Sequence, residues 1–90
     1  MKPVLMFILE SCPYCRQARG WMEELQQENP EFGKLNIEIV DERKQPEVAG
    51  RYDYYYVPTY YVNGEKLHEG AASKEMVRNV LSAACDQPAQ

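Results

Sequence analysis

Short apolar runs alternate with segments of helical periodicity along this chain of 90 residues. Residues 4–9 are apolar throughout, which is typical of a strand covered on both faces of a sheet. Apolar and polar side chains alternate over residues 35–39, and Val40 and Asp41 follow; this period of two predicts a second strand over residues 35–41. A helix between two such strands favours parallel pairing through a right-handed crossover.

The segment between these strands carries the signals of a helix start. Ser11 offers an N-cap, and Pro13 stands where a missing backbone N–H costs nothing, so a helix is expected to begin at Cys12 or Pro13. The helix is expected to bury Cys15 and to leave Cys12 at its exposed tip. Its apolar residues at helical spacing are Ala18, Trp21, Met22 and Leu25.

The remaining elements follow from turn and cap signals. Asn29-Pro30 and Gly33 mark the end of the first helix, and a short second helix is expected over residues 45–52, with Pro46 in its first turn. Residues 59–62 form a β-prone run, and Asn63-Gly64 is a strong hairpin signal that leads into an antiparallel strand over residues 66–69.

A final helix is expected after Ser73, which serves as its N-cap. The apolar face of this helix comprises Met76, Val77, Val80, Leu81 and Ala84. Residues 86–90 are expected to form a flexible tail. The predicted order is β-α-β-α-β-β-α, an α/β fold in which helices flank a four-stranded mixed sheet within one domain spanning residues 1–90.

Composition and charge reduce the classes of function that the chain is expected to serve. The chain is 44% hydrophobic and 27% charged, as expected for a packed domain. Its net charge of −4 and the lack of a basic stripe argue against nucleic acid as a partner. The apolar run at residues 4–9 is too short for the hydrophobic region of a secretory signal, so we expect a cytoplasmic protein without membrane association.

The motif Cys12-Pro13-Tyr14-Cys15 points to a chemistry. It puts one thiol at a helix N-terminus, where unpaired N–H groups and the helix dipole favour a thiolate, and a second thiol one turn along, where it can resolve a mixed disulfide. Arg16 is a candidate for stabilising that thiolate. Reduced thiols are the rule in the cytoplasm, so the spacing indicates redox or metal chemistry rather than a structural disulfide.

Two plainer interpretations of the cysteines stay open. Half of a zinc site is one, but only His68 and Cys85 remain as further imidazole or thiol ligands, and neither belongs to a second paired spacing. Inert buried thiols are the other. His68 is expected on the surface of a strand, and Cys85 is expected as a small buried side chain in the last helix.

Six tyrosines crowd the segment around Pro58, and packing in the strands is expected to account for at least two of them. Tyr14 and Tyr56 are the candidates for an aromatic wall beside the motif. The six are Tyr52, Tyr54, Tyr55, Tyr56, Tyr60 and Tyr61.

Over nearly its whole length the chain resembles the thioredoxin-like superfamily, and its Cys-Pro-Tyr-Cys motif is typical of dithiol glutaredoxins. Residues 34–38, 51–53, 57–59 and 70–74 look more like thioredoxin. In both families a cis proline precedes the third strand, and Pro58 matches it. The resemblance implies the thioredoxin fold and a substrate clamp at Val57-Pro58, where backbone groups pair with an extended substrate.

The resemblance also implies which residues touch the substrate, and it shows that the glutathione-binding pattern of glutaredoxins is incomplete in this chain. The implied substrate-binding residues are Pro13, Tyr14, Tyr56, Val57, Pro58 and Thr59. Glutaredoxins hold glutathione with a basic residue before the motif, a Thr-Val-Pro segment and a Gly-Gly-x-Asp turn. Here Glu10 stands near the motif, Tyr56 replaces the threonine, and residues 68–72 lack the aspartate. The Glu10 carboxylate would repel anionic glutathione and oppose a thiolate.

The function implied is that of a thiol–disulfide oxidoreductase. Cys12 would attack a disulfide in a protein or a small molecule, and Cys15 would resolve the mixed disulfide. We expect no metal and no tightly bound cofactor, a monomeric chain, and glutathione or a thioredoxin-reductase-type donor as reductant. The alternative is a non-catalytic binding module of the same fold, in which two chains share an iron–sulfur cluster or the domain serves as a scaffold.

Overall fold

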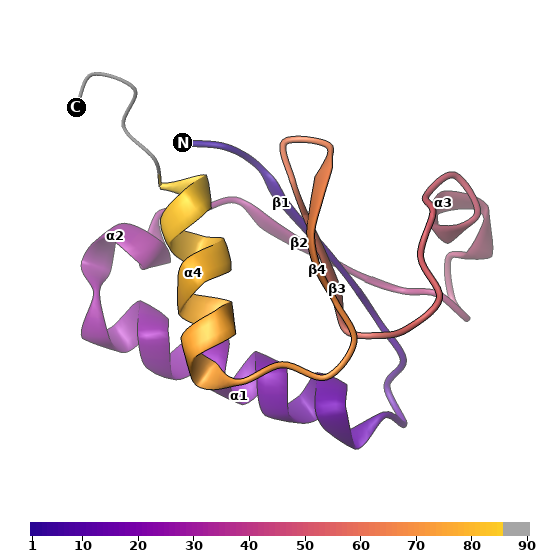
Figure 1. Ribbon diagram of the computed structural model, residues 1–90, viewed down its shortest axis with the longest axis horizontal. Helices are drawn as coiled ribbons and strands as arrows, with labels where there is room; N and C mark the ends of the chain where they lie inside the picture. Colours follow the sequence, from indigo (N-terminus) through magenta and orange to yellow (C-terminus); the bar gives the residue numbers. More distant parts are fainter. Residues whose placement is uncertain (86–90) are drawn as a thin grey trace.

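The computed structural model describes residues 1–85, in which a four-stranded sheet carries helices on both faces (Figure 1). The predicted tail at residues 86–90 lies outside the described residues. The elements are β1 (Val4–Ile8), α1 (Pro13–Glu28), α2 (Pro30–Gly33), β2 (Ile37–Asp41), α3 (Pro46–Ala49), β3 (Thr59–Val62), β4 (Glu65–Glu69) and α4 (Lys74–Ala84). The predicted mixed sheet with flanking helices is confirmed.

The sheet has the strand order β2-β1-β3-β4. Strand β1 pairs in parallel with β2, with Val4 opposite Ile37, and it pairs antiparallel with β3 on its other side. Strands β3 and β4 form the predicted antiparallel hairpin, and both turn residues have positive φ, 54° at Asn63 and 86° at Gly64. Two positive φ values at Asn-Gly are the signature of the turn that matches the twist of paired strands.

Strand β1 is apolar because it is buried on both faces. Met6 and Ile8 face a large core beneath α1 and α4, whereas Phe7 faces a smaller core beneath α3. The ring of Phe7 lies 5.0 Å from that of Tyr52 and 4.8 Å from that of Tyr54, measured between centroids. The two cores explain why a strand at the centre of the sheet lacks the alternation of a half-exposed strand.

The tyrosines of β3 take part in both cores. Tyr60 is fully buried in the larger core, where its hydroxyl lies 3.2 Å from the sulfur of Met22. Tyr61 packs edge-on against Phe7 in the smaller core, with ring centroids 5.9 Å apart. With Tyr52 and Tyr54 also packed against Phe7, the expectation that at least two of the six tyrosines serve packing is confirmed.

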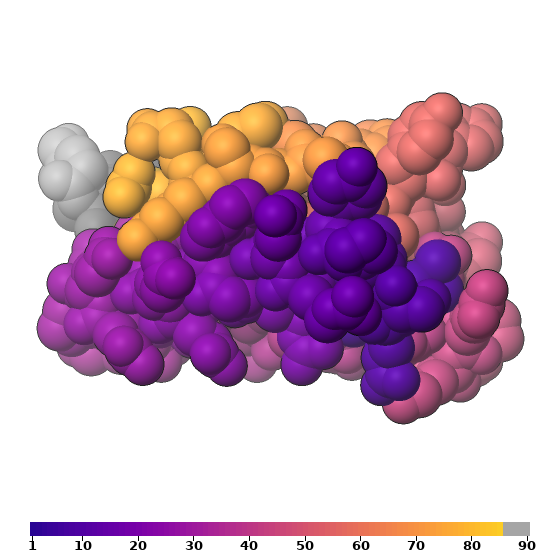
Figure 2. Space-filling model, turned by 90° about the horizontal axis from the view of Figure 1, so that it is seen from below, coloured from indigo at the N-terminus to yellow at the C-terminus, as the bar shows by residue number. Residues whose placement is uncertain are grey.

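Helices α1 and α4 lie side by side over the larger core, as Figure 2 shows on the face that α1 occupies. Lys74, at the start of α4, joins them through ion pairs with Glu24 at 2.9 Å and Glu28 at 2.8 Å on α1. No helix within residues 1–85 is both long enough and apolar enough to cross a membrane.

Several predicted helix boundaries are corrected by the structure. Cys12, not Ser11, is the N-cap of α1, and no side chain caps that helix, because the chain turns at residues 9–12 and helical geometry starts only at Pro13. Asn29 ends α1 and caps an additional short helix, α2, by accepting a hydrogen bond from the amide of Glu31 at 3.0 Å. Helix α3 is shorter than predicted and ends at Ala49.

Helix α4 has the predicted cap but a narrower apolar face. The Ser73 hydroxyl accepts a hydrogen bond from the amide of Met76 at 3.2 Å, which confirms the cap. Met76 itself is 40% exposed, because it lies at the edge of the helix and lines a hollow beside Leu67. Cys85 is half-buried and is the C-cap residue rather than part of the helix. Both were wrongly expected in the buried face.

Candidate active site

The first turn of α1 brings the two motif cysteines together. The carbonyl oxygen of Cys12 accepts hydrogen bonds from the amides of Cys15 at 3.1 Å and Arg16 at 3.2 Å, and the Cys12 amide donates to the Leu9 carbonyl at 3.0 Å. Both side chains are free thiols that lie close together. Cys12 is half-buried, whereas Cys15 is only 1% exposed. One thiol is therefore open to solvent and the other lies against the core.

Burial sets the protonation state of the inner thiol. It raises the pKa of Cys15 to about 12, and the neighbouring Cys12 side chain adds to the rise, whereas a backbone hydrogen bond at Leu9 acts in the opposite direction. Because a buried thiolate lacks hydration, Cys15 stays a thiol at neutral pH. Such a group reacts as a nucleophile only when its proton is removed or its surroundings change.

Charged groups surround the entrance to α1. The Arg16 guanidinium donates to the Glu10 carbonyl oxygen at 3.2 Å, so Arg16 is attached to the segment that precedes the motif. The Glu10 carboxylate forms an ion pair with Lys44 at 2.6 Å. Lys44 thus partly neutralises the carboxylate that sequence analysis placed near the thiols. The stabilising role of Arg16 stays a prediction.

The loop after β2 frames a small hollow beside the motif. Asp41 connects the segment before the motif with the loop after β2. Its carboxylate accepts hydrogen bonds from the amide of Glu10 at 3.1 Å and from the amide of Arg43 at 2.8 Å. The hollow has a volume of about 210 Å³ and is lined by Leu9, Glu10, Ser11, Asp41, Arg43 and Lys44. Arg43 and Lys44 were not predicted to belong to the site, because only the parallel pairing of β1 with β2 brings them there.

The Val57-Pro58 peptide bond is cis, which confirms the predicted cis proline before β3. Val57 is half-buried, and within residues 1–85 no hydrogen bond uses its backbone N–H or C=O. Pro58 and Thr59 are fully buried. The Thr59 hydroxyl donates to the Tyr56 carbonyl, so the Thr59 side chain supports the loop from the inside and offers no exposed surface to a substrate.

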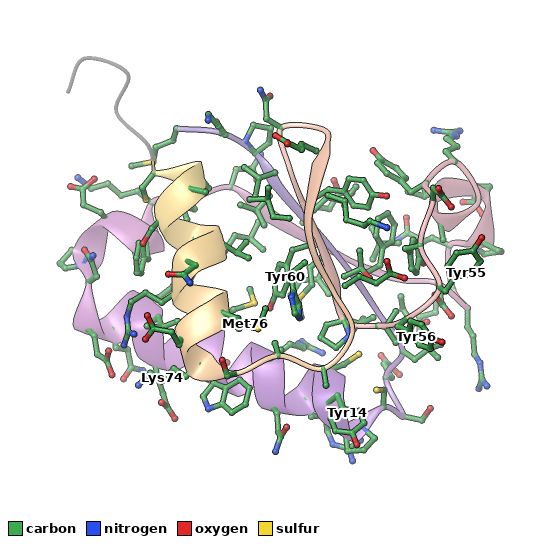
Figure 3. The ribbon with its side chains drawn as sticks, viewed as in Figure 1. Tyr14, Tyr55, Tyr56, Tyr60, Lys74 and Met76 are labelled. Carbon is green, nitrogen blue, oxygen red and sulfur yellow. The ribbon has the colours of Figure 1, made fainter. Side chains whose placement is uncertain are left out.

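Three tyrosines project from the surface in the half of the molecule that holds α3 (Figure 3). Tyr14 at the start of α1 is 55% exposed, and Tyr56 on the loop leading into β3 is 69% exposed. Tyr55, which sequence analysis did not select, is the most exposed at 84%. Pro13 is also exposed. Unlike Tyr60, which lies in the interior, these tyrosines are available to a partner.

His68 and Cys85 do not join the motif. The His68 Nε2 atom lies 3.0 Å from the Gly70 carbonyl and 3.1 Å from the Ala71 carbonyl, so it holds the turn between β4 and α4. Cys85 follows α4, whose C-terminal end lies at the opposite end of the molecule from the start of α1 (Figure 1). No three side chains of His, Cys, Asp or Glu gather into a metal-binding group within the part of the chain that the structure describes.

Comparisons with known proteins agree with this geometry. The family described as "Thioredoxin domain" matches residues 4–82. "Thioredoxin" from Methanocaldococcus jannaschii is 31% identical over 70 residues, which cover 78% of this chain and 80% of that protein.

Solved structures of thioredoxins share the fold. Malassezia sympodialis thioredoxin matches with a TM-score of 0.76 at 19% identity, covering 94% of this chain and 76% of that one. Oxidised thioredoxin from Plasmodium falciparum matches with a TM-score of 0.72 at 19% identity, covering 94% and 82%. The family and its curated relative indicate thiol–disulfide oxidoreductase chemistry in general. With a family match that spans most of its length and two thiols at the start of α1, the chain belongs to the thioredoxin domain family.

Proposed function

We propose that the protein reduces disulfides in proteins or small molecules through a Cys12–Cys15 dithiol/disulfide couple. One observation carries the proposal: a half-exposed thiol at the N-cap of α1 stands one helical turn from a buried thiol. A nucleophile must reach the substrate, and a resolving thiol must reach only the nucleophile. The general chemistry follows from the family, whereas the roles of the individual residues belong to the proposal.

The reaction has two exchange steps. The Cys12 thiolate attacks one sulfur of the substrate disulfide, whose S–S bond breaks, and the departing substrate thiolate takes up a proton. Cys15 then loses its proton and attacks the Cys12 sulfur, which releases the second substrate thiol. The substrate gains two electrons and two protons, and the protein is left with a Cys12–Cys15 disulfide. Glutathione or a donor of the thioredoxin-reductase type must supply two electrons to return the pair to its reduced form.

The loop before β3 is the proposed docking site. An extended segment of the substrate would pair with the backbone N–H and C=O of Val57, which have no partner within residues 1–85. Pro13, Tyr14 and Tyr56 would form the apolar border, since each is exposed. Pro58 and Thr59 would shape the loop from within. The proposal includes a monomeric, cytoplasmic protein, with Arg16 stabilising the Cys12 thiolate.

A redox titration with thiol counting tests the couple. The purified protein is equilibrated in glutathione and dithiothreitol buffers, and alkylated cysteines are counted by mass. We expect a two-electron transition confined to Cys12 and Cys15, with a midpoint near the glutaredoxin range of about −200 to −230 mV or near about −270 mV as in thioredoxin. A protein that showed no such transition would lack the proposed activity.

Single substitutions separate the two roles. Cys12→Ser is expected to abolish insulin reduction, whereas Cys15→Ser is expected to accumulate mixed disulfides on Cys12. Cys85→Ser is the matched control, because Cys85 lies at the far end of α4 and its loss should leave the titration unchanged. Insulin reduction that survived Cys12→Ser would refute the assignment of the nucleophile. Bound iron and colour in freshly purified protein would instead favour the cluster-binding alternative.

A further inference from the structure

One carboxylate holds the backbone of the loop that leads to Val57. Oε2 of Glu69, the last residue of β4, accepts hydrogen bonds from the amides of two consecutive residues, Tyr55 at 2.5 Å and Tyr56 at 3.0 Å. Successive N–H groups that converge on one point form a concavity suited to an anion. In this chain the concavity is filled by Glu69 itself.

The same carboxylate is fixed from its other side. Its Oε1 accepts from the Lys66 ammonium at 2.7 Å, and Lys66 also donates to the Asp53 carbonyl at 3.2 Å. The Tyr61 hydroxyl donates to that same carbonyl at 2.8 Å. The loop from Asp53 to Tyr56 has neither helical nor strand pairing, so side-chain contacts hold it in place. Those from β3 and β4 act at Asp53, Tyr55 and Tyr56, while the Tyr54 hydroxyl donates to the Glu42 carboxylate at 2.7 Å.

The Lys66–Glu69 pair is better shielded than the ion pair beside the motif. Its side chains are 36% and 20% exposed, compared with 64% and 61% for Lys44 and Glu10. Charge-assisted hydrogen bonds are stronger than neutral ones, and shielding from water preserves that strength. Glu69 therefore has the partners and the environment to impose one conformation on the loop.

We propose that Glu69 is a positioning residue for polypeptide substrates, which fixes the loop so that Tyr55, Tyr56 and the backbone of Val57 face an extended chain. The inference rests on the proposed oxidoreductase function and adds the substrate class. An extended polypeptide around a disulfide contacts the loop over several residues. A small aromatic disulfide needs access only to Cys12, so it does not depend on Glu69.

The hydrogen bonds of Glu69 and Thr59 to the loop explain how Glu69 influences substrate docking without touching the substrate. Glu69 binds the two amides on the inner side of the loop, and the side chains of Tyr55 and Tyr56 stand outward with 84% and 69% exposure. The Thr59 hydroxyl holds the Tyr56 carbonyl, which lies directly before Val57. A loop held at both the amide and the carbonyl of Tyr56 presents Val57 in a fixed direction, which lowers the entropic cost of docking a peptide.

The test compares a protein disulfide with a small one. Steady-state reduction of insulin and of 5,5′-dithiobis(2-nitrobenzoate) is measured for wild type, Glu69→Ala, Glu69→Gln and Glu75→Ala. Glu75 is the matched control, since it also forms an ion pair three residues apart in sequence, with Arg78 at 2.7 Å, and its removal changes the charge equally. The Gln variant keeps an oxygen that can accept from both amides.

We expect Glu69→Ala to raise KM for insulin about tenfold, which corresponds to about 1.4 kcal/mol, with kcat and the kinetics of the small disulfide unchanged. Glu69→Gln should recover most of the loss, and Glu75→Ala should behave as wild type. An unchanged KM for insulin in Glu69→Ala, or an equal loss with both disulfides, would overturn the positioning role. A wild-type protein inactive on both disulfides would overturn the proposed function and this role with it.

Discussion

The amide of Cys15 donates to the carbonyl oxygen of Cys12 at 3.1 Å, so one turn of α1 holds a half-exposed thiol and a buried thiol in a fixed relation. The difference in exposure divides the two roles that disulfide exchange requires. In the proposed reaction the outer sulfur meets the substrate, and the inner sulfur meets only the outer one. The start of α1 would then set the order of the two exchange steps.

The two thiols should differ sharply in their reaction with alkylating reagents. Burial raises the pKa of Cys15 from its ordinary value of 9.0 to about 12, so its thiolate fraction at pH 8 is reduced by roughly a thousandfold. We expect iodoacetamide to modify Cys12 first in the reduced native protein, with Cys15 modified at the ordinary rate only in urea. Peptide mapping by mass spectrometry measures both rates. Equal labelling of the two thiols in the native state would contradict the assignment.

The same shift predicts a dependence of stability on alkaline pH. A thiol whose pKa is raised by folding stabilises the native state fully below its unfolded pKa near 9.0, and that contribution is lost as pH rises toward about 12. The reduced wild type should therefore lose more stability over this window than Cys15→Ala, which has no thiol to ionise there. Urea unfolding at successive pH values checks the difference. Parallel pH profiles for the two proteins would be inconsistent with the buried thiol.

The lowered pKa of Glu69 predicts that stability also falls at acid pH, in the opposite direction along the pH scale. The hydrogen bond from Lys66, followed by the amide of Tyr55, lowers the pKa of Glu69 from 4.5 to about 2. A carboxyl group whose pKa is lowered by folding stabilises the native state above its unfolded pKa, and that contribution is lost as pH falls toward 2. The stability advantage of wild type over Glu69→Gln should shrink between pH 4.5 and 2, as followed by urea unfolding. An advantage that stayed constant across this window would refute the prediction.

Two glycines should respond to alanine with opposite signs. Gly64 has a φ of +86°, where a side chain is strained, so Gly64→Ala should destabilise the protein by about 1–2 kcal/mol. Gly20 lies in α1, where a Cβ atom would meet no other group within 4 Å, so Gly20→Ala should stabilise by about 0.4–1 kcal/mol. Thermal and urea unfolding measure both changes. A destabilised Gly20→Ala would show that the open space at that face of α1 is needed.

Local signals predicted much of the fold, because they act within a few residues. Asn63-Gly64 and Ser73 are examples: a turn that needs positive φ and a cap that needs a hydroxyl are written in neighbouring residues. The wrong predictions concern features that residues adjacent in sequence do not determine. Met76 has the right helical spacing for the core, but it lines a hollow beside Leu67 of β4 and is left 40% exposed.

The amino-acid sequence by itself determined the order of the strands and of the helices other than α2, the hairpin, and the placement of Cys12 and Cys15 at a helix start, since periodicity and cap chemistry are local. Only the tertiary structure decided which charged groups meet. Lys44 pairs with Glu10 across 34 residues, and Glu69 reaches the amide of Tyr55 across 14. Such contacts depend on strand pairing and register, which bring distant segments to the same end of the strands, and no local pattern encodes them.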